Sequence, residues 1–263
     1  MRQAIVLVSF GVSDTRQQQI CIAPLAQDIR REFPAYEVFE AYTSAMIRRR
    51  LSAQGIAVPA LEELLSRLAA DGYERVVLQP SHLTPGEEYD RKVRPAAAAF
   101  AGQFSCLQLG RPAFFSTGED GGPDDYKTGL QAVLQSAAVQ DGEELVLMGH
   151  GSPHRHNDVY ERLQMAADEA GAPVHVGVLE AGDKPSLDDV LARLRAAGAQ
   201  RVLLAPLLLV GGRHTSEDMA GEDPASWKNR LQAAGYTVRL HLHGMGEAAP
   251  FRQLYLQHLH ELI

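Results

Sequence analysis

The sequence has few of the features that mark secreted, membrane-spanning or nucleic-acid-binding proteins. Its 263 residues include only two cysteines, Cys21 and Cys106, which are too few for a disulfide framework. No apolar run approaches the roughly 20 residues that cross a bilayer. The formal net charge of -8 argues against a nucleic-acid surface, because phosphate binding needs clustered Lys and Arg. We therefore expect a cytoplasmic protein that has no membrane or nucleic-acid partner.

Three common catalytic motifs are also missing. The sequence has no G-x-x-x-x-G-K-[ST] phosphate loop, no G-x-G-x-x-G after its first apolar run and no G-x-S-x-G nucleophile elbow. Nucleotide-driven chemistry and serine hydrolysis therefore lose support, and we expect no nucleotide cofactor.

Short apolar runs alternate with amphipathic stretches along the whole chain. The composition is that of an ordinary globular protein, with 45% hydrophobic and 22% charged residues. The apolar runs are AIVLVSF, EVFEAY, RVVLQP and CLQLG in the first half, and ELVLMGH, VHVGVLE, RVLLAPLLLV and TVRLHL in the second. Such alternation is typical of parallel βαβ units.

The two halves resemble each other in sequence. VLVSFG at 6–11 matches VLMGHG at 146–151, and GYERVVLQP matches GAQRVLLAP. The change in offset between these matches places about fourteen extra residues in the first half, and they include TSAMIRRRL. We predict two similar flavodoxin-like or Rossmann-like α/β domains, related by duplication, with a cleft between them. The expected bounds are 1–125 and 126–246, with a helix over 247–263 that packs back on the first domain.

Three potential metal ligands follow three apolar runs of the second half. His150, Glu180 and His214 each lie at a predicted strand end, where ligands bind in open parallel sheets. Two imidazoles and a carboxylate suit Co²⁺, Ni²⁺, Fe²⁺ or Zn²⁺ and leave coordination positions open. The simpler alternative is that each side chain has only a structural role. We assign no ligand role to His82, although it also lies at a strand end, or to His154 and His156, for which we favour a helix start.

The duplication places Glu88 opposite His214 and Phe10 opposite His150. If both domains face one cleft, Glu88 is a candidate base or second metal contact, and Phe10 a candidate substrate contact. A capped helix start is the alternative for Glu88.

Arginines form the one local cluster of positive charge. Arg48 and Arg49 lie in the extra segment with Arg50, and Arg213 precedes His214. Guanidinium groups bind carboxylates in pairs of hydrogen bonds, so these arginines are candidate contacts to a polycarboxylate substrate. A solvated helix face is the alternative.

An ordered set of motifs resembles the sirohydrochlorin cobaltochelatases of anaerobic cobalamin biosynthesis. The motifs are SFG, TSAMIRRRL, QPSHLTPGEEYD, MGHGSPH, GVLEAG, PLLLVGGRHTSEDMAGEDPASWK and GMGE. They span nearly the whole chain, and MGHG with GGRH-x-x-x-DM is the strongest pair.

The resemblance implies a class II, ATP-independent chelatase that inserts Co²⁺ into sirohydrochlorin or its oxidised precorrin relative. It also implies that His150 and His214 bind the metal with Glu180 as acidic partner, and that Glu88 is the functional glutamate of the first domain. Some members of this family are exported, whereas this chain begins directly at its first predicted strand, so the resemblance points to a cytoplasmic form.

Three other functions fit the same residues. One is a ferrochelatase or nickel chelatase that acts on sirohydrochlorin or a porphyrin, because first-row metals share these ligands. Another is a non-catalytic tetrapyrrole or metal carrier, and the last is a generic α/β protein whose histidines are incidental. A homo-oligomer is compatible with the sequence, which does not specify the oligomeric state.

Overall fold

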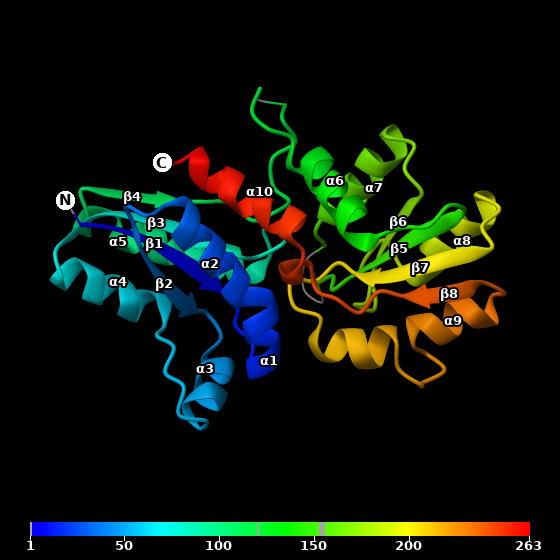
Figure 1. Cartoon of the computed structure of the whole chain (residues 1–263), viewed down its shortest axis with the longest axis horizontal. Coiled ribbons are helices and arrows are strands. Elements are labelled where there is room, and N and C mark those ends of the chain that lie inside the picture. Colours follow the sequence, from blue (N-terminus) through cyan, green and yellow to red (C-terminus); the bar gives the residue numbers. More distant parts are fainter. Residues whose placement is uncertain (1, 120, 153–155) are drawn as a thin grey trace. The chain divides into compact units, whose positions relative to one another are not determined.

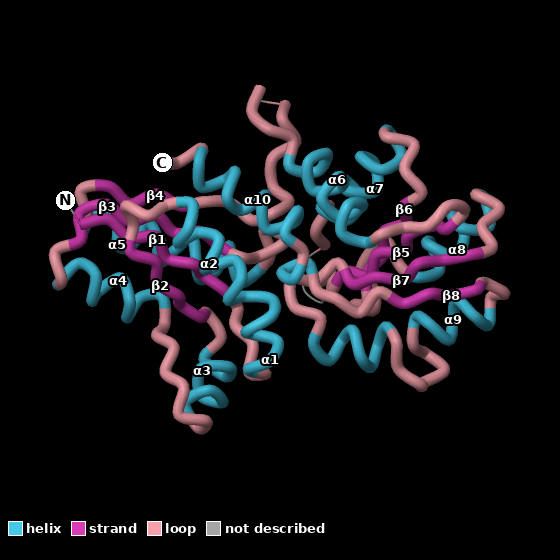
Figure 2. The backbone as a smooth tube through the Cα atoms, in the orientation of Figure 1, coloured by secondary structure: helices cyan, strands magenta, loops and turns pink. Residues whose placement is uncertain are grey.

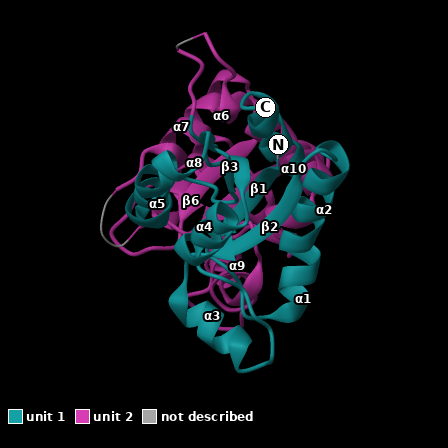
Figure 3. Cartoon of the chain, turned by 90° about the vertical axis from the view of Figure 1, so that its left-hand side faces the viewer, with its two compact units in different colours: residues 1–115, 252–263 teal, residues 116–251 magenta. Residues whose placement is uncertain are grey.

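A computed structural model describes residues 2–119, 121–152 and 156–263. The chain forms two compact units (Figure 3). Unit 1 comprises residues 1–115 and 252–263, and unit 2 comprises residues 116–251. Each unit is described by itself below.

Unit 1 contains a four-stranded parallel sheet in the order β2-β1-β3-β4. Its strands are β1 (Arg2–Ser9), β2 (Glu37–Tyr42), β3 (Tyr73–Pro80) and β4 (Cys106–Leu109). The residues from Ala4 to Val8 are fully buried, because helices cover both faces of the sheet. This explains why the first strand is an unbroken apolar run and does not alternate with polar residues.

The helices of unit 1 lie on both faces of its sheet (Figure 1). They are α1 (Thr15–Gln17), η1 (Gln18–Ile22), α2 (Ala23–Glu32), α3 (Ala45–Ser52), α4 (Leu61–Ala70), η2 (Tyr89–Val93), α5 (Arg94–Phe100), η3 (Ala101–Gln103) and α10 (Ala249–His260). Helix α4 buries Leu61, Leu64, Leu65 and Leu68, the spacing of one helical face, against one side of β1 and β3. Helices α2 and α10 lie on the opposite side (Figure 1).

Unit 2 repeats this sheet, with the order β6-β5-β7-β8 and all strands parallel. Its strands are β5 (Glu143–Gly149), β6 (Val174–Val178), β7 (Arg201–Pro206) and β8 (Thr237–Leu240). Its helices are α6 (Asp125–Ala137), α7 (Val159–Glu169), α8 (Leu187–Ala196), η4 (His214–Met219), α9 (Trp227–Ala233) and η5 (Met245–Glu247). Figure 2 distinguishes the strands from the helices in both units.

The predicted fold class is confirmed, because two α/β units carry parallel sheets of the same strand order. Both third strands lead to a π-helical turn, η2 in unit 1 and η4 in unit 2. The extra segment of the first half forms α3. Residues 179–186, all of which are described, connect β6 to α8 without a helix.

The division between the units falls ten residues before the expected boundary at residue 125. Ser116 and Asp125 exchange hydrogen bonds, since each backbone N–H donates to the other residue, and Asp124 caps α6. These bonds attach Ser116 and Asp124 to the first helix of unit 2, so both residues belong to that unit.

Residues 252–263 complete unit 1. The Arg252 guanidinium pairs with the buried Asp28 carboxylate at 2.6 Å, and the Tyr255 hydroxyl donates to the Ser81 carbonyl at 2.9 Å. Leu254 and Leu259 of α10 are also buried. Within the described residues, no helix is both long enough and apolar enough to cross a membrane.

Candidate metal centre

Two histidines lie side by side at the carboxyl edge of the sheet in unit 2. His150 directly follows β5, and His214 begins η4 after β7, the neighbouring strand. Their ring centroids are 4.8 Å apart and the ring planes are nearly perpendicular, at 88°. The structure thus brings together two of the three side chains that the sequence suggested as metal ligands.

One nitrogen of each imidazole is held by an oxygen that can only accept a hydrogen bond. His214 Nδ1 lies 2.8 Å from the Asp218 carboxylate, and His150 Nδ1 lies 3.2 Å from the Gly151 carbonyl. In a neutral ring the proton is therefore on Nδ1, and Nε2 carries the free lone pair. A carboxylate behind a histidine is a common way to orient a metal ligand. Both rings are therefore prepared to bind a metal through Nε2.

Glu180 is linked to this pair through its backbone. Its N–H donates to the His150 carbonyl at 2.9 Å, two residues beyond the end of β6. However, no group of three His, Cys, Asp or Glu side chains within residues 2–119, 121–152 and 156–263 is placed to hold a metal ion. The three predicted ligands therefore do not form a complete set in this structure, because the Glu180 carboxylate has not joined the two imidazoles.

Asp183 contacts Ser152 and His156, two residues that follow His150 in the sequence. Its buried carboxylate accepts hydrogen bonds from Ser152 N at 2.7 Å and Lys184 N at 2.9 Å, and lies 2.8 Å from His156 Nδ1. Burial alone would raise the pKa of Asp183, but these hydrogen bonds outweigh it and the pKa is lowered. The hydrogen bond to Asp183 likewise raises the pKa of His156. Asp183 therefore joins the loop after β5 to the turn after β6, which carry His150 and Glu180.

The glycines beside His150 allow close packing. A Cβ at Gly149 would lie 2.3 Å from the Tyr160 ring, and one at Gly151 would lie 3.0 Å from the Asp183 carboxylate. Gly151 also has a φ of +78°, which favours glycine. The structure therefore shows a turn at His150 that is packed against protein side chains.

A cavity of about 980 Å³ in unit 2 reaches Glu180 and Asp218. Its lining is strongly acidic, and the one basic side chain in it, Arg230, already pairs with Asp188 at 2.5 Å. The carboxylates that line it are Glu180, Asp183, Asp188, Glu217, Asp218, Glu222 and Asp223. Such a surface attracts a divalent cation and repels a polycarboxylate.

In unit 1, the corresponding strand ends carry Glu88 and Phe10. Glu88 immediately precedes η2, and its Oε1 pairs with Lys92 Nζ at 2.7 Å. Phe10 directly follows β1 and is 44% exposed. An exposed ring at a strand end is available to contact a flat ligand.

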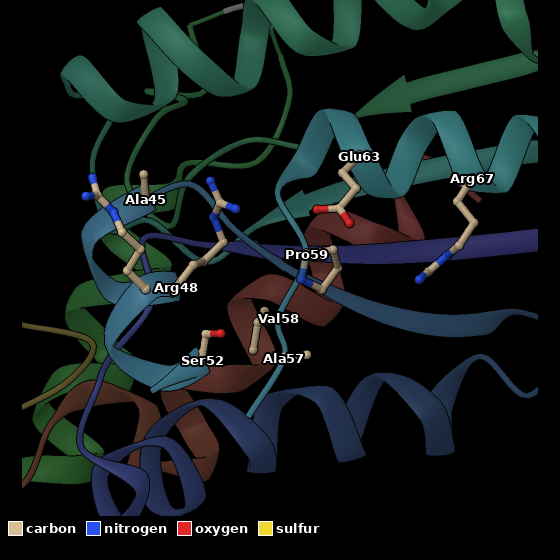
Figure 4. A pocket seen from close by; sticks show the side chains of 9 residues that line it. Ala45, Arg48, Ser52, Ala57, Val58, Pro59, Glu63 and Arg67 are labelled. Atoms are coloured by element: carbon tan, nitrogen blue, oxygen red, sulfur yellow. The ribbon is translucent and has the colours of Figure 1, made fainter. Parts of the chain in front are cut away.

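A second cavity, of about 520 Å³, lies in unit 1 between α3 and the start of α4 (Figure 4). Arg48, Arg49 and Arg67 line it, and within the described part of the chain none of the three has an ion-pair partner. Glu63 also lines it but is occupied as the cap of Ala60 N. The cavity is therefore suited to an anion.

Arg213 is placed differently. It is exposed, and its Nε donates to Glu217 at 2.7 Å. His156 precedes α7 and pairs with Asp183, while His154 lies outside the described residues.

The sequence did not identify Asp183, Asp218 or Arg67 as site residues. Asp218 follows His214 by four residues on η4, the spacing at which helical side chains meet, so this partner could have been found. Asp183 and Arg67 reach their sites through tertiary contacts, for which the sequence carries no local signal.

Comparison with solved structures defines the class of this fold. SirB from Bacillus subtilis with Fe³⁺ superposes with a TM-score of 0.68 at 17% identity, over 99% of this chain and 95% of that one. A multi-domain Deinococcus radiodurans protein with structural similarity to chelatases has a TM-score of 0.61 at 16% identity, over 98% of this chain and 54% of that one. The fold is therefore that of the two-domain α/β chelatases.

The chain belongs to the cobalt chelatase (CbiK) family, whose model matches residues 3–263. The sirohydrochlorin cobaltochelatase of Salmonella typhimurium is 34% identical over 100% of this chain and 97% of its own length. The sirohydrochlorin cobaltochelatase CbiKC of Nitratidesulfovibrio vulgaris is also 34% identical, over 98% of this chain and 89% of its own length. The family resemblance noted from the sequence motifs is thus confirmed.

Proposed function

We propose that this protein inserts Co²⁺ into sirohydrochlorin, or its oxidised precorrin relative, in anaerobic cobalamin biosynthesis without using a nucleotide. The observation that carries the proposal is the His150–His214 pair, whose rings lie 4.8 Å apart with both Nδ1 atoms engaged. The family and the activities named for the relatives at 34% identity support the choice of metal and macrocycle.

In this proposal the metal is a substrate that is bound and then released. His150 and His214 hold Co²⁺ through Nε2, and Glu180 completes the set when its side chain rotates toward them. Two imidazoles and a carboxylate leave coordination positions open, so pyrrole nitrogens can replace water on the ion. The acidic cavity beside Glu180 supplies the cation.

The macrocycle requires different contacts, because it carries carboxylates and must lose two pyrrole N–H protons. We assign carboxylate binding to Arg48, Arg49 and the exposed Arg213, and ring contact to Phe10. Glu88, with Glu180 as a further candidate, accepts a pyrrole proton, and His150 can do so only after its Nε2 has released the metal. Binding that aligns the metal with the pyrrole nitrogens lowers the barrier by removing the need for a chance encounter.

The purified protein tests this function directly. Sirohydrochlorin absorbance is followed after addition of Co²⁺, Fe²⁺ or Ni²⁺ in turn, without nucleotide. Multiple turnovers with Co²⁺ support the proposal. Faster turnover with Fe²⁺ or Ni²⁺ would identify that ion, and not Co²⁺, as the preferred metal substrate. Stoichiometric binding without turnover indicates a carrier. If both His150→Ala and His214→Ala insert Co²⁺ at the rate of the parent protein, the assignment of these histidines as metal ligands is wrong. A cytoplasmic location belongs to the same proposal and is tested by cell fractionation.

A further inference from the structure

A second pair of imidazoles follows β8 in unit 2. His241 is the first residue after this strand, and its N–H donates to the Leu204 carbonyl of β7 at 2.9 Å. His243 comes two residues later, and positions i and i+2 share a face where a chain continues in the extended form. The two ring centroids are 5.2 Å apart, with an interplanar angle of 61°. The two histidines are therefore neighbours in space at the carboxyl edge of the sheet.

The separation of these two rings is that of two ligands on one metal ion. An imidazole nitrogen lies about 2.0–2.1 Å from a bound Zn²⁺, so two rings at adjacent positions of one ion have centroids roughly 5 Å apart. The rings of His150 and His214, at 4.8 Å, have a similar separation. Unit 2 thus contains two histidine pairs whose spacing suits a shared ion.

Glu247 holds His243 in the way that Asp218 holds His214. Its Oε2 lies 2.8 Å from His243 Nδ1, and its Oε1 accepts from the Gly244 N–H at 3.0 Å. In both pairs the carboxylate follows the histidine by four residues. This partner keeps the proton of a neutral ring on Nδ1 and leaves the lone pair on Nε2. The His243 side chain is 66% exposed, so an ion in solvent has access to it.

The segment after this pair is fixed by backbone contacts to the connection between β7 and η4. The Met245 N–H donates to the Leu208 carbonyl at 2.8 Å, and the Gly246 N–H donates to the Leu209 carbonyl at 2.9 Å. Gly244 packs so closely that a Cβ on it would lie 2.6 Å from the Leu209 carbonyl. A backbone that is already held loses little freedom when its side chains bind an ion.

His241 presents a ring that no hydrogen bond occupies. Within the described residues, neither of its nitrogens bonds to a protein group, and the residue is partly buried. One nitrogen of a neutral imidazole always carries a lone pair, so His241 can bind an ion without losing another partner. Together with His243 Nε2, it supplies two nitrogen ligands.

We propose that His241 and His243 form a second binding site for a first-row divalent metal ion, with Glu247 as a positioning residue. This site is separate from the His150–His214 pair, because no group of three His, Cys, Asp or Glu side chains in the described part of the chain is placed to hold one ion. Water fills the other coordination positions. Imidazole pairs bind Co²⁺, Ni²⁺ and Cu²⁺ with affinity that rises in this order. The inference concerns metal binding alone and does not rest on the proposed function.

The experiment counts the Ni²⁺ ions bound by the full chain in equilibrium dialysis without tetrapyrrole, at a pH above about 6.5 so that the imidazoles are neutral. We expect His241→Ala and His243→Ala each to lose the same single equivalent of Ni²⁺, and the double variant to lose no more than that. His260→Ala is the matched control. Residues 258–260 repeat the letters His-Leu-His on α10, where positions i and i+2 do not face each other, and His260 pairs with Glu32 at 3.0 Å. This variant should bind as many ions as the parent.

A combined variant, His150→Ala with His243→Ala, tests whether the two sites are separate. It should lose two equivalents of Ni²⁺, one from each pair, and an unchanged Tm shows that neither loss comes from unfolding. The inference fails if His241→Ala and His243→Ala bind as much Ni²⁺ as the parent, if His260→Ala loses an equivalent too, or if the combined variant loses only one. If His150→Ala alone keeps all of its Ni²⁺, the metal centre of the proposed function is overturned instead.

Discussion

Removal of the Asp218 carboxylate should weaken Co²⁺ binding by about tenfold. Its Oδ2 lies 2.8 Å from His214 Nδ1, where it keeps the proton on that nitrogen and directs the Nε2 lone pair outward. Without it, His214 can rotate and can adopt the other tautomer, in which Nε2 carries the proton and cannot bind a metal. Asp218→Ala therefore lowers affinity without removing a ligand.

The exposure of the pair sets the size of the effect. Loss of a carboxylate behind a metal-binding histidine typically costs 10- to 100-fold in affinity. The His214 and Asp218 side chains are 45% and 44% exposed, so water screens their interaction and competes for it. We therefore expect the lower end of the range, which is about 1.4 kcal/mol of binding free energy.

The assay is competition for Co²⁺ against a chromophoric chelator, without tetrapyrrole. Glu217→Ala is the matched control, because Glu217 lines the same acidic cavity but pairs with Arg213. Its affinity should stay within about twofold of the parent. The reasoning is refuted if Asp218→Ala binds Co²⁺ as tightly as the parent. It is also refuted if Glu217→Ala loses as much, since general negative charge would then be responsible.

Two further outcomes test the arginine cavity and the loop after β5. Arg48→Ala should raise KM for sirohydrochlorin several-fold at similar kcat, because one carboxylate contact typically contributes about 1 kcal/mol or more. Arg50 is a neighbour that does not line the cavity, so Arg50→Ala should leave KM unchanged. An equal rise in KM for both variants would show that only net charge matters. His156→Gln should lower Tm more at pH 5.5 than at pH 9. The hydrogen bond to Asp183 raises the pKa of His156, so the stabilisation is complete below the unfolded pKa of about 6.5 and is lost as pH rises through the folded value. An equal loss at both pH values would contradict this assignment.

The central strands were recognisable in the sequence, because β1, β3, β5 and β7 are buried on both faces and are therefore largely apolar. The residues from Ala4 to Val8 and from Leu145 to Met148 are all fully buried. The internal match of VLVSFG with VLMGHG then implied that both units share one topology, and their sheets have the same order.

The sequence could predict only those parts of the site whose positions are set by the path of the backbone. His150 and His214 follow neighbouring parallel strands, so their backbones must come close, and their rings lie together. The Glu180 carboxylate depends on side-chain torsions, which no pattern in the sequence fixes. The hydrogen bonds of Asp183 to Ser152 and Lys184 depend on how two loops pack, which is also invisible in the sequence.

The return of residues 252–263 to unit 1 has a consequence for biosynthesis. Ribosomes release a chain in order, and N-terminal domains generally fold first. Here all of unit 2 is synthesised before the segment with Arg252 and Tyr255, which contact Asp28 and Ser81. The half that begins first is thus the half that finishes last. Until then the Asp28 carboxylate has only Arg31 as its guanidinium partner, and one face of the sheet lacks its covering helix α10.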